Sequence, residues 1–568
     1  MSLAEEIKKI VKGEVRDGAD VLKAFSSDAS IFAVHPELVV APHSPEDVMA
    51  LVKFVNEHKS EYPHLSLTAR AAGTDMSGGP LSESIVLDFM TYFQGVKNVD
   101  EGKQESTVLP GTYYRDFEKA TLEKGLLLPC YTASRELCTV GGMVANNSGG
   151  EKTLRYGKTI DFVNELKVVL SDGELHSIKP LSKSELEKKI TEDSFEGHIY
   201  KQIWELISEN KELLAKAKPK VHKNSAGYYL WDIWNGETQT FDLNKLIVGS
   251  QGTLGIVTEI KYRLIKPAEH SALLVIFLDG LTELAKVVGK VLEFHPESFE
   301  SYDDQTMKLA VRFAPDLLKR LGAKNLLSLG LKFWPEIKMI LTGGVPKLIL
   351  VAEFTGDSEK EVYDKAYEAE RALKPFDLGT HVAYDDAEEN KYWTIRRESF
   401  ALLRKHVHGK HTAPFIDDIV VIPEHLPEFL PRLADITKDY KINYTIAGHV
   451  GDGNFHIIPL MDFARPDMGK IIRELSQKVY ALVIEFGGSI TGEHNDGLIR
   501  TPFLEQMYGK EVVALFKRTK EIMDPLNIFN PGKKVPVYSQ GSRPEGGIEH
   551  LGAGTLGYAL EHFRHDWS

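Results

Sequence analysis

The chain of 568 residues contains only two cysteines, Cys130 and Cys138. So few thiols exclude a disulfide framework and an all-cysteine iron–sulfur cluster. Long hydrophobic runs are also missing: stretches such as ALLVIFL at 272–278 are far shorter than the roughly 20 residues of a membrane-spanning helix. Excess positive charge is absent as well. The net charge of -14 argues against nucleic acid as a partner, because nucleic acid needs a basic footprint.

What remains is the composition of an ordinary globular protein, with 42% hydrophobic and 26% charged residues. The length predicts two or three domains. The N-terminal stretch MSLAEEIKKIVKGEV has a charged amphipathic pattern, which predicts a helix and not a secretory signal. Together with reduced cysteines, it favours a cytoplasmic location, and peripheral contact with the inner membrane stays open.

The order of the expected elements predicts an α+β fold. PHSPEDVMALVKFVNE predicts a helix that begins at Ser44-Pro45, and ELKVVLSDGELHSI predicts a hairpin that turns at Asp172-Gly173. KLIVGSQGTLGIVTEIKYRLIKP predicts a strand, a glycine turn and a second strand. From about residue 268 strands alternate with helices, as in a sheet that is covered by helices. We therefore expect four parts: residues 1–267, 268–480, 481–537 and a tail at 538–568 without an assigned role.

Two glycine-rich loops of the first part are candidates for binding a phosphorylated ligand. RAAGTDMSGG at 70–79 combines glycines with the hydroxyls of Thr74 and Ser77, so that its backbone N–H groups can point at a diphosphate. It is not a P-loop, because no Gly-Lys-Ser/Thr follows. About sixty residues later, SRELCTVGGMVANNSGGEKTLRYG is equally rich in small residues. Two such loops favour a large phosphorylated cofactor.

A second group of residues has the chemistry of a metal site. GHVGDGNFHIIPL at 448–460 places His449 and His456 on a glycine-rich loop that leads into a short strand. Glu493 and His494 follow in SITGEHNDG. Three imidazoles and a carboxylate suit zinc, manganese or iron(II), unless one of the four acts as a base. A metal-dependent hydrolase with purely structural glycine loops stays an alternative at this point.

Taken together, these stretches resemble the FAD-linked oxidases of the vanillyl-alcohol-oxidase/p-cresol-methylhydroxylase fold. The nearest branch is that of the D-2-hydroxyacid dehydrogenases, with D-lactate dehydrogenase, D-2-hydroxyglutarate dehydrogenase and the glycolate oxidase flavin subunit. The resemblance implies a two-part FAD-binding domain formed by residues 1–267 and the returning segment 481–537, with an α/β cap (substrate) domain at 268–480. It runs from about residue 25 to 535 through PHSPEDV, RAAGTDMSGG, CTVGGMVANNSGG, RYG, GSQGTLGIVTE, GHVGDGNFH, GEHNDG and DPLNIFNPGK.

The resemblance implies that both glycine loops and the GTLGIV stretch line FAD. Some relatives attach FAD to a histidine of the first loop, where this chain has Asp75 and Met76. We therefore expect non-covalent FAD, with Cys130 as the one remaining candidate for a link. The cofactor-binding residues carried over from the family are Arg70, Ala71, Ala72, Gly73, Thr74, Asp75, Ser77, Gly78, Ser134, Thr139, Gly141, Gly142, Asn146, Ser148, Gly149, Gly255, Ile256, Val257 and Asn530.

The resemblance also implies the roles at the reacting end. His449, His456 and Glu493 match the metal ligands, and His494 matches the catalytic histidine. Arg397, in the helical stretch YWTIRRESFALLRK, matches the arginine that holds the substrate carboxylate. In the implied mechanism the metal lowers the pKa of the substrate α-hydroxyl, the histidine takes its proton, and a hydride passes to flavin N5.

Three departures from the hydroxyglutarate-type pattern bear on the substrate. This chain has Ile458 in place of an asparagine and Ala401 in place of a threonine, and only Lys410 could stand in for a further substrate lysine. Because those groups help to hold a second carboxylate, we expect a D-lactate-like 2-hydroxyacid.

The sequence leaves the acceptor and two related functions open. No fused iron–sulfur module is present, so the expected electron acceptor is a quinone, an electron-transfer protein, oxygen or another subunit. A homodimer is compatible with the sequence. The alternatives are a flavin-dependent transferase of the alkylglycerone-phosphate-synthase type, which has no net redox reaction, and a flavin-binding subunit of a larger complex.

Overall fold

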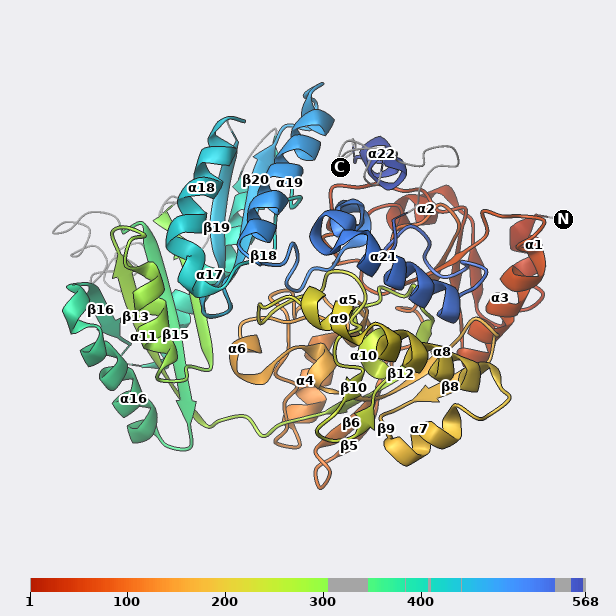
Figure 1. Cartoon of the computed structure of the whole chain (residues 1–568), viewed down its shortest axis with the longest axis horizontal. Helices are drawn as coiled ribbons and strands as arrows, with labels where there is room; N and C mark the ends of the chain where they lie inside the picture. The colour runs from red at the N-terminus through yellow and green to blue at the C-terminus, as the bar shows by residue number, and fades with distance from the viewer. Residues whose placement is uncertain are drawn as a thin grey trace.

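The computed structural model describes residues 2–304, 346–383, 385–406, 410–440, 442–536 and 553–564. Two main sheets and one small sheet lie in the first half of the chain, and a larger one, called the third sheet below, lies mainly in the second half (Figure 1). The mixed α/β architecture expected from the sequence is confirmed. Ala401, which stands where relatives have a threonine, lies in a helix, but its side chain is outside the described residues, as are residues 538–552 and 565–568 of the tail.

The first sheet has four strands, three of them parallel, with β1 antiparallel at one edge. The chain enters its glycine loop directly from the end of β3, so this sheet fixes where the loop begins. Its spatial order is β1 (Glu14–Arg16), β2 (Leu38–Ala41), β4 (Ile85–Asp88) and β3 (Leu67–Arg70).

The second sheet is antiparallel throughout. The predicted hairpin at Asp172-Gly173 is confirmed, since β7 pairs with β8 across that turn. The order is β5 (Val96–Asp100), β6 (Glu105–Val108), β12 (Ile256–Arg263), β7 (Val163–Val169) and β8 (Leu175–Ile178), and a small sheet nearby has the order β10 (Trp234–Asn235), β11 (Thr240–Phe241) and β9 (Leu181–Ser182).

The third sheet belongs to the second half of the chain and is also antiparallel. Helices of this half form a layer over one face of it (Figure 1). The order is β16 (Gly379–Val382), β13 (His270–Leu278), β15 (Leu348–Gly356), β14 (Ser298–Asp303), β19 (Asn443–His449), β20 (Asn454–Met461) and β17 (His411–Thr412), and β18 (Ile419–Val420) also pairs with β20.

The helix predicted at Ser44-Pro45 is confirmed as α3, in which Pro45 occupies the first turn and Val48, Leu51, Val52 and Val55 form one buried face. Two other expectations are wrong. The N-terminal helix ends at Ile7, and β1 takes up part of the stretch. The stretch that begins at Lys245 was expected as a strand, but residues 244–247 form α10.

The remaining helices include a long pair, α19 and α21, through which the chain returns from the third sheet; α21 packs against α8 of the first half. The helices are α1 (Leu3–Ile7), α2 (Ala19–Phe25), α3 (Pro45–His58), α4 (Tyr114–Leu122), α5 (Val140–Asn146), α6 (Thr153–Tyr156), α7 (Lys183–Lys189), α8 (Phe195–Glu209), α9 (Lys211–Ala217), α10 (Asn244–Ile247), α11 (Leu284–Leu292), α16 (Glu359–Ala372), α17 (Asp386–His406), α18 (Leu426–Lys438), α19 (Met468–Glu485), α20 (Gly497–Arg500), α21 (Leu504–Met523) and α22 (Ala553–Glu561), with short 3-10 turns such as η4 (Val450–Asp452).

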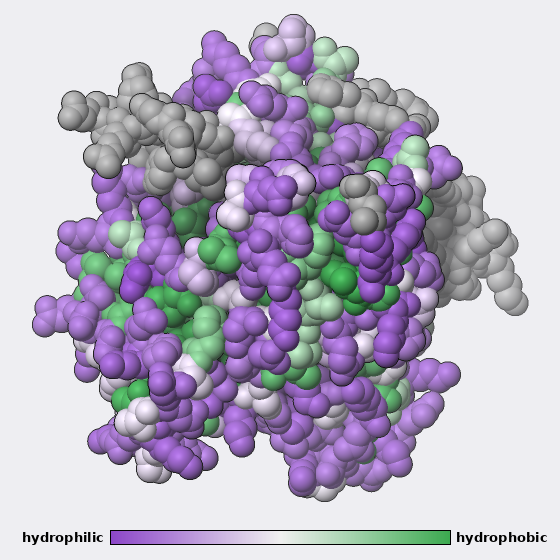
Figure 2. Space-filling model, turned by 90° about the vertical axis from the view of Figure 1, so that its right-hand side faces the viewer, coloured by the Kyte–Doolittle hydropathy of each residue, from purple (hydrophilic) through white to green (hydrophobic). Residues whose placement is uncertain are grey.

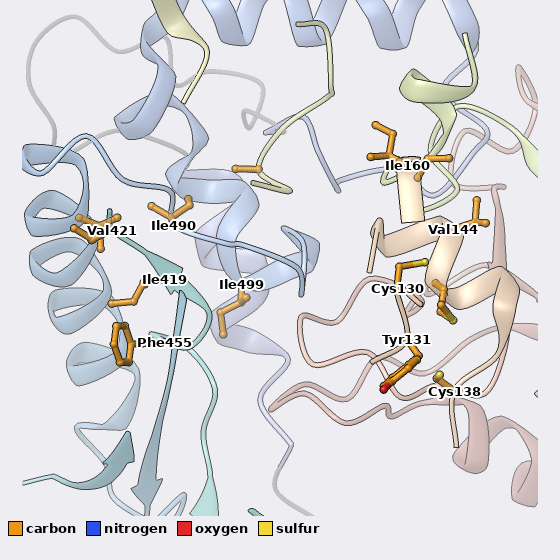
Figure 3. Packing of buried hydrophobic residues seen from close by; sticks show 14 of the residues in the cluster. Cys130, Tyr131, Cys138, Val144, Ile160, Ile419, Val421, Phe455, Ile490 and Ile499 are labelled. Carbon is orange, nitrogen blue, oxygen red and sulfur yellow. The ribbon is translucent and has the colours of Figure 1, made fainter. Parts of the chain in front are cut away.

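One continuous hydrophobic cluster extends from the first half of the chain into the second, so the two halves share buried contacts. The tail joins it: the backbone of Phe563 pairs with Phe32, and the two rings stack. Figure 3 shows Ile419, Val421, Phe455 and Ile490 on one side of the cluster, Cys130, Tyr131, Cys138, Val144 and Ile160 on the other, and Ile499 between them.

The surface agrees with the composition. On the face drawn in Figure 2, hydrophilic side chains cover most of the area and hydrophobic ones gather in scattered patches. Within the described ranges, no helix is both long and apolar enough to cross a bilayer.

Candidate active site

The hairpin β19–β20 positions the first two predicted metal ligands. His449 is the last residue of β19, and His456 lies on β20, paired with Ala447. The turn between them requires a glycine at Gly453, because its φ is +67° and a Cβ there would lie 1.7 Å from the carbonyl oxygen of Val421. The glycines of this motif therefore serve a tight antiparallel turn. The short strand expected after the loop is confirmed as part of β20, whereas His449, expected on the loop, ends a strand.

The four predicted residues converge on one point. Three imidazole Nε2 atoms surround Oε1 of Glu493, at 3.3 Å for His449, 3.5 Å for His456 and 4.0 Å for His494. The rings of His449 and His456 are 5.3 Å apart, and those of His456 and His494 are stacked at 5.0 Å. Nitrogen and carboxylate donors that face one another in this way are the ligand set of a zinc-like divalent metal.

The other nitrogen of each ring faces a buried carboxylate. Nδ1 of His449 lies 2.6 Å from Glu300 of β14. Asp417 serves the other two rings, with Oδ1 3.2 Å from Nδ1 of His456 and Oδ2 3.0 Å from Nδ1 of His494. A carboxylate behind the imidazole fixes the ring and leaves Nε2 as the free donor, which is the usual arrangement around a metal-binding histidine. The residues present therefore fit a divalent metal.

Asp418 is close enough to be a ligand itself, since one donor atom each of Asp418, His456, Glu493 and His494 lie within 4.8 Å of one another. Its hydrogen bonds point to a different role. Oδ2 accepts from the backbone N–H groups of Glu493 and His494, at 2.9 and 2.8 Å, and from Thr491 Oγ1 at 2.6 Å. Oδ1 accepts from an amide side chain at 3.1 Å. Asp418 therefore holds the turn that carries Glu493 and His494.

Two buried lysines offset the negative charge of the centre. Nζ of Lys223 lies 3.2 Å from Oε2 of Glu493 and 3.4 Å from Asp452. Lys158 donates to Ser225 and to the carbonyl oxygen of Gly492, next to Glu493. Burial lowers the pKa of Lys158 to about 7.

The acidic and basic groups of the centre shift one another. Burial alone would raise the pKa of Glu493, but Lys223 and His449 hold it well below its usual value. Burial likewise opposes ionisation of His456, yet Asp417 and Glu493 raise its pKa to about 10. His494 and His456 lower the pKa of Asp417, although its burial alone would raise it. The carboxylates of the centre are thus ionised and available to a cation.

The first glycine loop has the form of an anion cradle. Among the described residues, the backbone N–H groups of residues 72–76 donate to no protein acceptor. Asp75 turns inward, where its Oδ2 accepts from Ser77 and from the N–H of Gly79. Arg70 lies beneath the loop and donates to the carbonyl oxygens of Phe25 and Ser27. Unpaired N–H groups above this support fit a diphosphate, and Arg70 shapes the loop instead of reaching out of it.

The second glycine run is joined to the first. Asn146, at the end of α5, donates to Oδ1 of Asp75 and accepts from Gln251. Thr139 caps α5 by accepting from Gly142. The two loops that carry the predicted cofactor residues, Ala71 to Gly78 and Thr139 to Gly149, are therefore hydrogen-bonded to each other, and Ser134 is exposed.

Gly149 links the two glycine loops to the metal-type centre, which consists of His449, His456, Glu493 and His494. A Cβ on Gly149 would lie 2.7 Å from Thr153 Oγ1 and 3.1 Å from Oε2 of Glu493. Ser148, the preceding predicted residue, is buried. The end of the glycine run and the carboxylate of the centre are thus in contact.

Four other predicted cofactor residues are placed differently. The side chain of Ile256 lies in the hydrophobic core around α3, so only its backbone could face a ligand, whereas Val257 is partly exposed. Gly255, at φ +155°, packs against Val168. Asn530 uses its amide to bridge the carbonyl oxygens of Gly79 and Gln251. These residues support the loops more than they line a surface.

The predicted carboxylate clamp, Arg397, is paired with an acid. Its Nε and Nη2 donate to both oxygens of Glu151, at 3.1 and 2.5 Å, and its guanidinium lies over the ring of Trp393. Ile458 is buried on the same strand as His456 and two residues further on, so the two side chains share a face of the sheet. Lys410 is exposed.

Sequence reasoning missed six charged residues of this site: Glu151, Lys158, Lys223, Glu300, Asp417 and Asp418. A signal existed for the last two, because consecutive acids in FIDDIVV sit inside an apolar run where ionised groups need partners. Glu300 similarly lies in a strand that is buried from Ser298 to Tyr302. No local pattern marks Glu151 or Lys223.

Comparison with known protein families agrees with this geometry. The family of FAD linked oxidases, C-terminal domain, matches residues 267–534, and the FAD binding domain family matches residues 36–179. The chain belongs to the FAD-linked oxidases of the vanillyl-alcohol-oxidase/p-cresol-methylhydroxylase family and carries its FAD-binding domain. This membership removes the hydrolase alternative, in which the glycine loops would be purely structural.

Individual relatives lie within the 2-hydroxyacid dehydrogenase branch. D-2-hydroxyglutarate dehydrogenase of Escherichia coli strain K12 is 24% identical over 90% of this chain and 49% of its own, so the chain spans about half the length of that relative. D-lactate dehydrogenase of Anaerostipes hadrus is 27% identical over 94% of this chain and 96% of its own. The solved structure of p-cresol methylhydroxylase has the same fold, with a TM-score of 0.65 at 14% identity over 94% of this chain and 96% of that one.

Proposed function

We propose that this chain is an FAD-dependent, metal-assisted dehydrogenase that oxidises a small D-2-hydroxyacid, D-lactate-like, to the 2-oxoacid. The observation that carries the proposal is the convergence of three imidazole Nε2 atoms on Glu493 Oε1, with that carboxylate in contact with the glycine run at Gly149. A redox flavin site and a Lewis-acid site that share a border suit oxidation of an alcohol next to a carboxylate.

The residues that would hold the two groups are at hand. His449, His456 and Glu493 would bind the divalent metal, of the zinc, manganese or iron type, and the two glycine loops would hold FAD. When bound, the metal supplies a Lewis acid for the substrate hydroxyl and FAD supplies the two-electron acceptor. We propose residues 1–267 with 481–537 as the FAD-binding domain and residues 268–480 as the cap domain.

His494 is the proposed base. Its side chain is the most exposed of the three histidines, its Nε2 lies 4.0 Å from Glu493, and Asp417 faces its Nδ1. The buried carboxylate of Asp417 would stabilise the imidazolium that forms when Nε2 takes the hydroxyl proton. Arg397 would orient the substrate carboxylate, and the apolar Ile458 offers no partner for a second one.

FAD is expected to be held without a covalent bond. The first loop contains no histidine. Cys130 is buried in the core, where burial raises the pKa of its thiol to about 12. A thiol of that kind is a poor nucleophile. The acceptor of the electrons would be an external quinone, an electron-transfer protein, oxygen or another subunit.

An anaerobic titration of the flavin-loaded protein tests the proposal. D-Lactate, L-lactate, glycolate and D-2-hydroxyglutarate are added separately, and the visible flavin band is followed. We expect bleaching by D-lactate and none by L-lactate. A flavin that no D-2-hydroxyacid bleaches would refute the dehydrogenase and favour the non-redox transferase or a flavin-binding subunit.

Variants locate the chemistry. His494→Gln should retain flavin and metal, yet reduce the flavin about 10²–10⁴-fold more slowly, which is the usual contribution of a general base. His198→Gln is the matched control, because His198 lies exposed on α8. Unchanged flavin reduction in His494→Gln would remove this histidine from the mechanism.

A further inference from the structure

The pairing of Arg397 with Glu151 is unexpected at a site for an anionic substrate. Glu151 follows directly on the glycine run that ends at Gly149-Gly150, and its carboxylate takes Nε and Nη2 of Arg397. The hydroxyl of the buried Tyr131 donates to the same carboxylate at 3.0 Å. Although burial would raise the pKa of Glu151, Arg397 holds it at about 2, so that the carboxylate is ionised at every working pH.

Only one edge of Arg397 is left for another anion. A guanidinium offers a side edge, made of Nε and Nη2, and an end edge, made of Nη1 and Nη2. Glu151 occupies the side edge, and Nη1 contacts no acceptor among the residues that the structure describes. About a third of the Arg397 side chain is exposed, at 33%. The end edge can therefore receive one carboxylate, beside a negative charge that stays in place.

Short contacts fix this pair relative to the metal-type centre. The carbonyl oxygen of Gly150 lies 3.4 Å from Nζ of Lys223, which lies 3.2 Å from Glu493. On α17, the preceding Arg396 pairs with Glu300, the carboxylate that faces His449. A carboxylate placed on Arg397 is thus held at a defined position from the site of the hydroxyl.

Resting on the dehydrogenase function proposed above, we propose that Glu151 determines the substrate class: it holds Arg397 for one carboxylate and repels a second, so that monocarboxylic 2-hydroxyacids are selected over dicarboxylic ones. With Glu151 present, the arginine pair is neutral before substrate binds. A monocarboxylate then adds one negative charge, and a dicarboxylate adds two beside the ionised Glu151. Like charges in a partly buried site disfavour the second, which is discrimination by repulsion.

The test compares D-lactate with D-2-hydroxyglutarate in wild type, Glu151→Gln and Glu151→Asp. In Glu151→Gln the amide keeps the size and can still accept from Tyr131, but the charge is lost. We expect the KM for D-2-hydroxyglutarate to fall by about tenfold or more, with kcat and the KM for D-lactate changing much less. Glu151→Asp keeps the charge and should keep the wild-type preference.

A binding measurement gives the same answer without turnover. Perturbation of the flavin spectrum yields Kd for pyruvate and for 2-oxoglutarate, the two product-type anions, in each variant. Glu151→Gln should shift the ratio of the two Kd values by about tenfold toward 2-oxoglutarate. The matched control is Glu485→Gln, because the exposed Glu485 also accepts two hydrogen bonds from an arginine, those of Nη1 and Nη2 of Arg432.

Either result decides the matter. A ratio of the two Kd values that is unchanged in Glu151→Gln would overturn the role of Glu151. An equal fall in the KM values for D-lactate and D-2-hydroxyglutarate would overturn it too, because Glu151 would then merely compete with every substrate. If wild type is reduced by no D-2-hydroxyacid, the proposed function fails, and the ratio of the two Kd values still decides whether Glu151 selects one carboxylate over two. If Glu151→Gln does not retain flavin, Glu151→Asp against wild type carries the test: a changed preference with the charge retained would refute the proposal.

Discussion

Substitution of Asp418 by asparagine separates a residue that positions ligands from one that is a ligand. Asp418 is fully buried, and its Oδ2 accepts from the N–H groups of Glu493 and His494 and from Thr491 Oγ1. Its Oδ1 accepts from Asn454 Nδ2. Asparagine has the same size but only one acceptor oxygen, so it can serve the three donors only if its NH₂ group turns toward Asn454.

The expected loss follows from those bonds. Three hydrogen bonds to a carboxylate become bonds to a neutral amide, at about 1 kcal/mol each, so the turn is held less firmly by about 3 kcal/mol. If the whole amount appears in metal binding, the affinity falls about 100-fold, the upper end for a residue that supports ligands. Competition with a chromophoric chelator measures the zinc affinity of each variant at fixed pH.

A control and a limit make this result decisive. Asp47→Asn alters a buried aspartate that also accepts three backbone hydrogen bonds, but in the first sheet region. It should lower thermal stability and leave zinc affinity unchanged. Zinc affinity of Asp418→Asn equal to wild type would refute the positioning role. A loss as large as that of Glu493→Gln would make Asp418 a direct ligand, which equally contradicts the reasoning.

Three further changes have expected outcomes. Gly149→Ala brings a Cβ to 2.7 Å from Thr153 Oγ1 and against the metal-type centre, so flavin and zinc content should both fall, as measured by absorbance and metal analysis. His176 is paired with Asp172, and this pairing raises its pKa to about 9 against its burial. The contribution of the pair to stability is full below pH 6.5 and is lost as the pH rises through 9, and it is at most about 3 kcal/mol and nearer about 1–2 kcal/mol after screening. His176→Gln should therefore lower the Tm at pH 6 and not at pH 10. Gly289→Ala, exposed within α11 with open space around it, should stabilise by about 1 kcal/mol in thermal unfolding, and a lower Tm would contradict this.

The parts of the fold that the sequence predicted are those where a local rule acts alone. Pro45 and the acids after it begin α3, and Asp172-Gly173 turns the hairpin of β7 and β8. The strand predicted from Lys245 was wrong, and residues 244–247 form a helix, because a short apolar run is too short to show the period that separates a strand from a helical turn. The N-terminal helix is shorter than predicted for another reason. The end of the stretch pairs with β2 as β1, and no local sequence pattern predicts that contact.

The site divides along the same line. Its histidines and Glu493 stand in glycine-bounded motifs, and the structure brings them together. The acids that orient the rings come from strands and turns elsewhere in the chain, such as Glu300 at 149 residues from His449. Glu300 faces His449 because of the register between β14 and β19, and that register is set by the tertiary structure. Sequence reasoning could therefore name the donors but not what aims them.

The centre draws its donors from segments that are otherwise separate. His449 and His456 lie on the third sheet, Glu493 and His494 on the segment that returns from it, and Lys223 with Gly149 on the first half of the chain. On α17 the neighbouring Arg396 and Arg397 reach to both sides, one to Glu300 of the third sheet and one to Glu151 of the glycine run. A cation bound by His449, His456 and Glu493 would join the third sheet to the segment that returns from it, so its binding energy would stabilise that contact. The substrate anion would act nearby, because Arg397, the arginine proposed to receive it, already joins α17 to Glu151 of the glycine run in the first half of the chain.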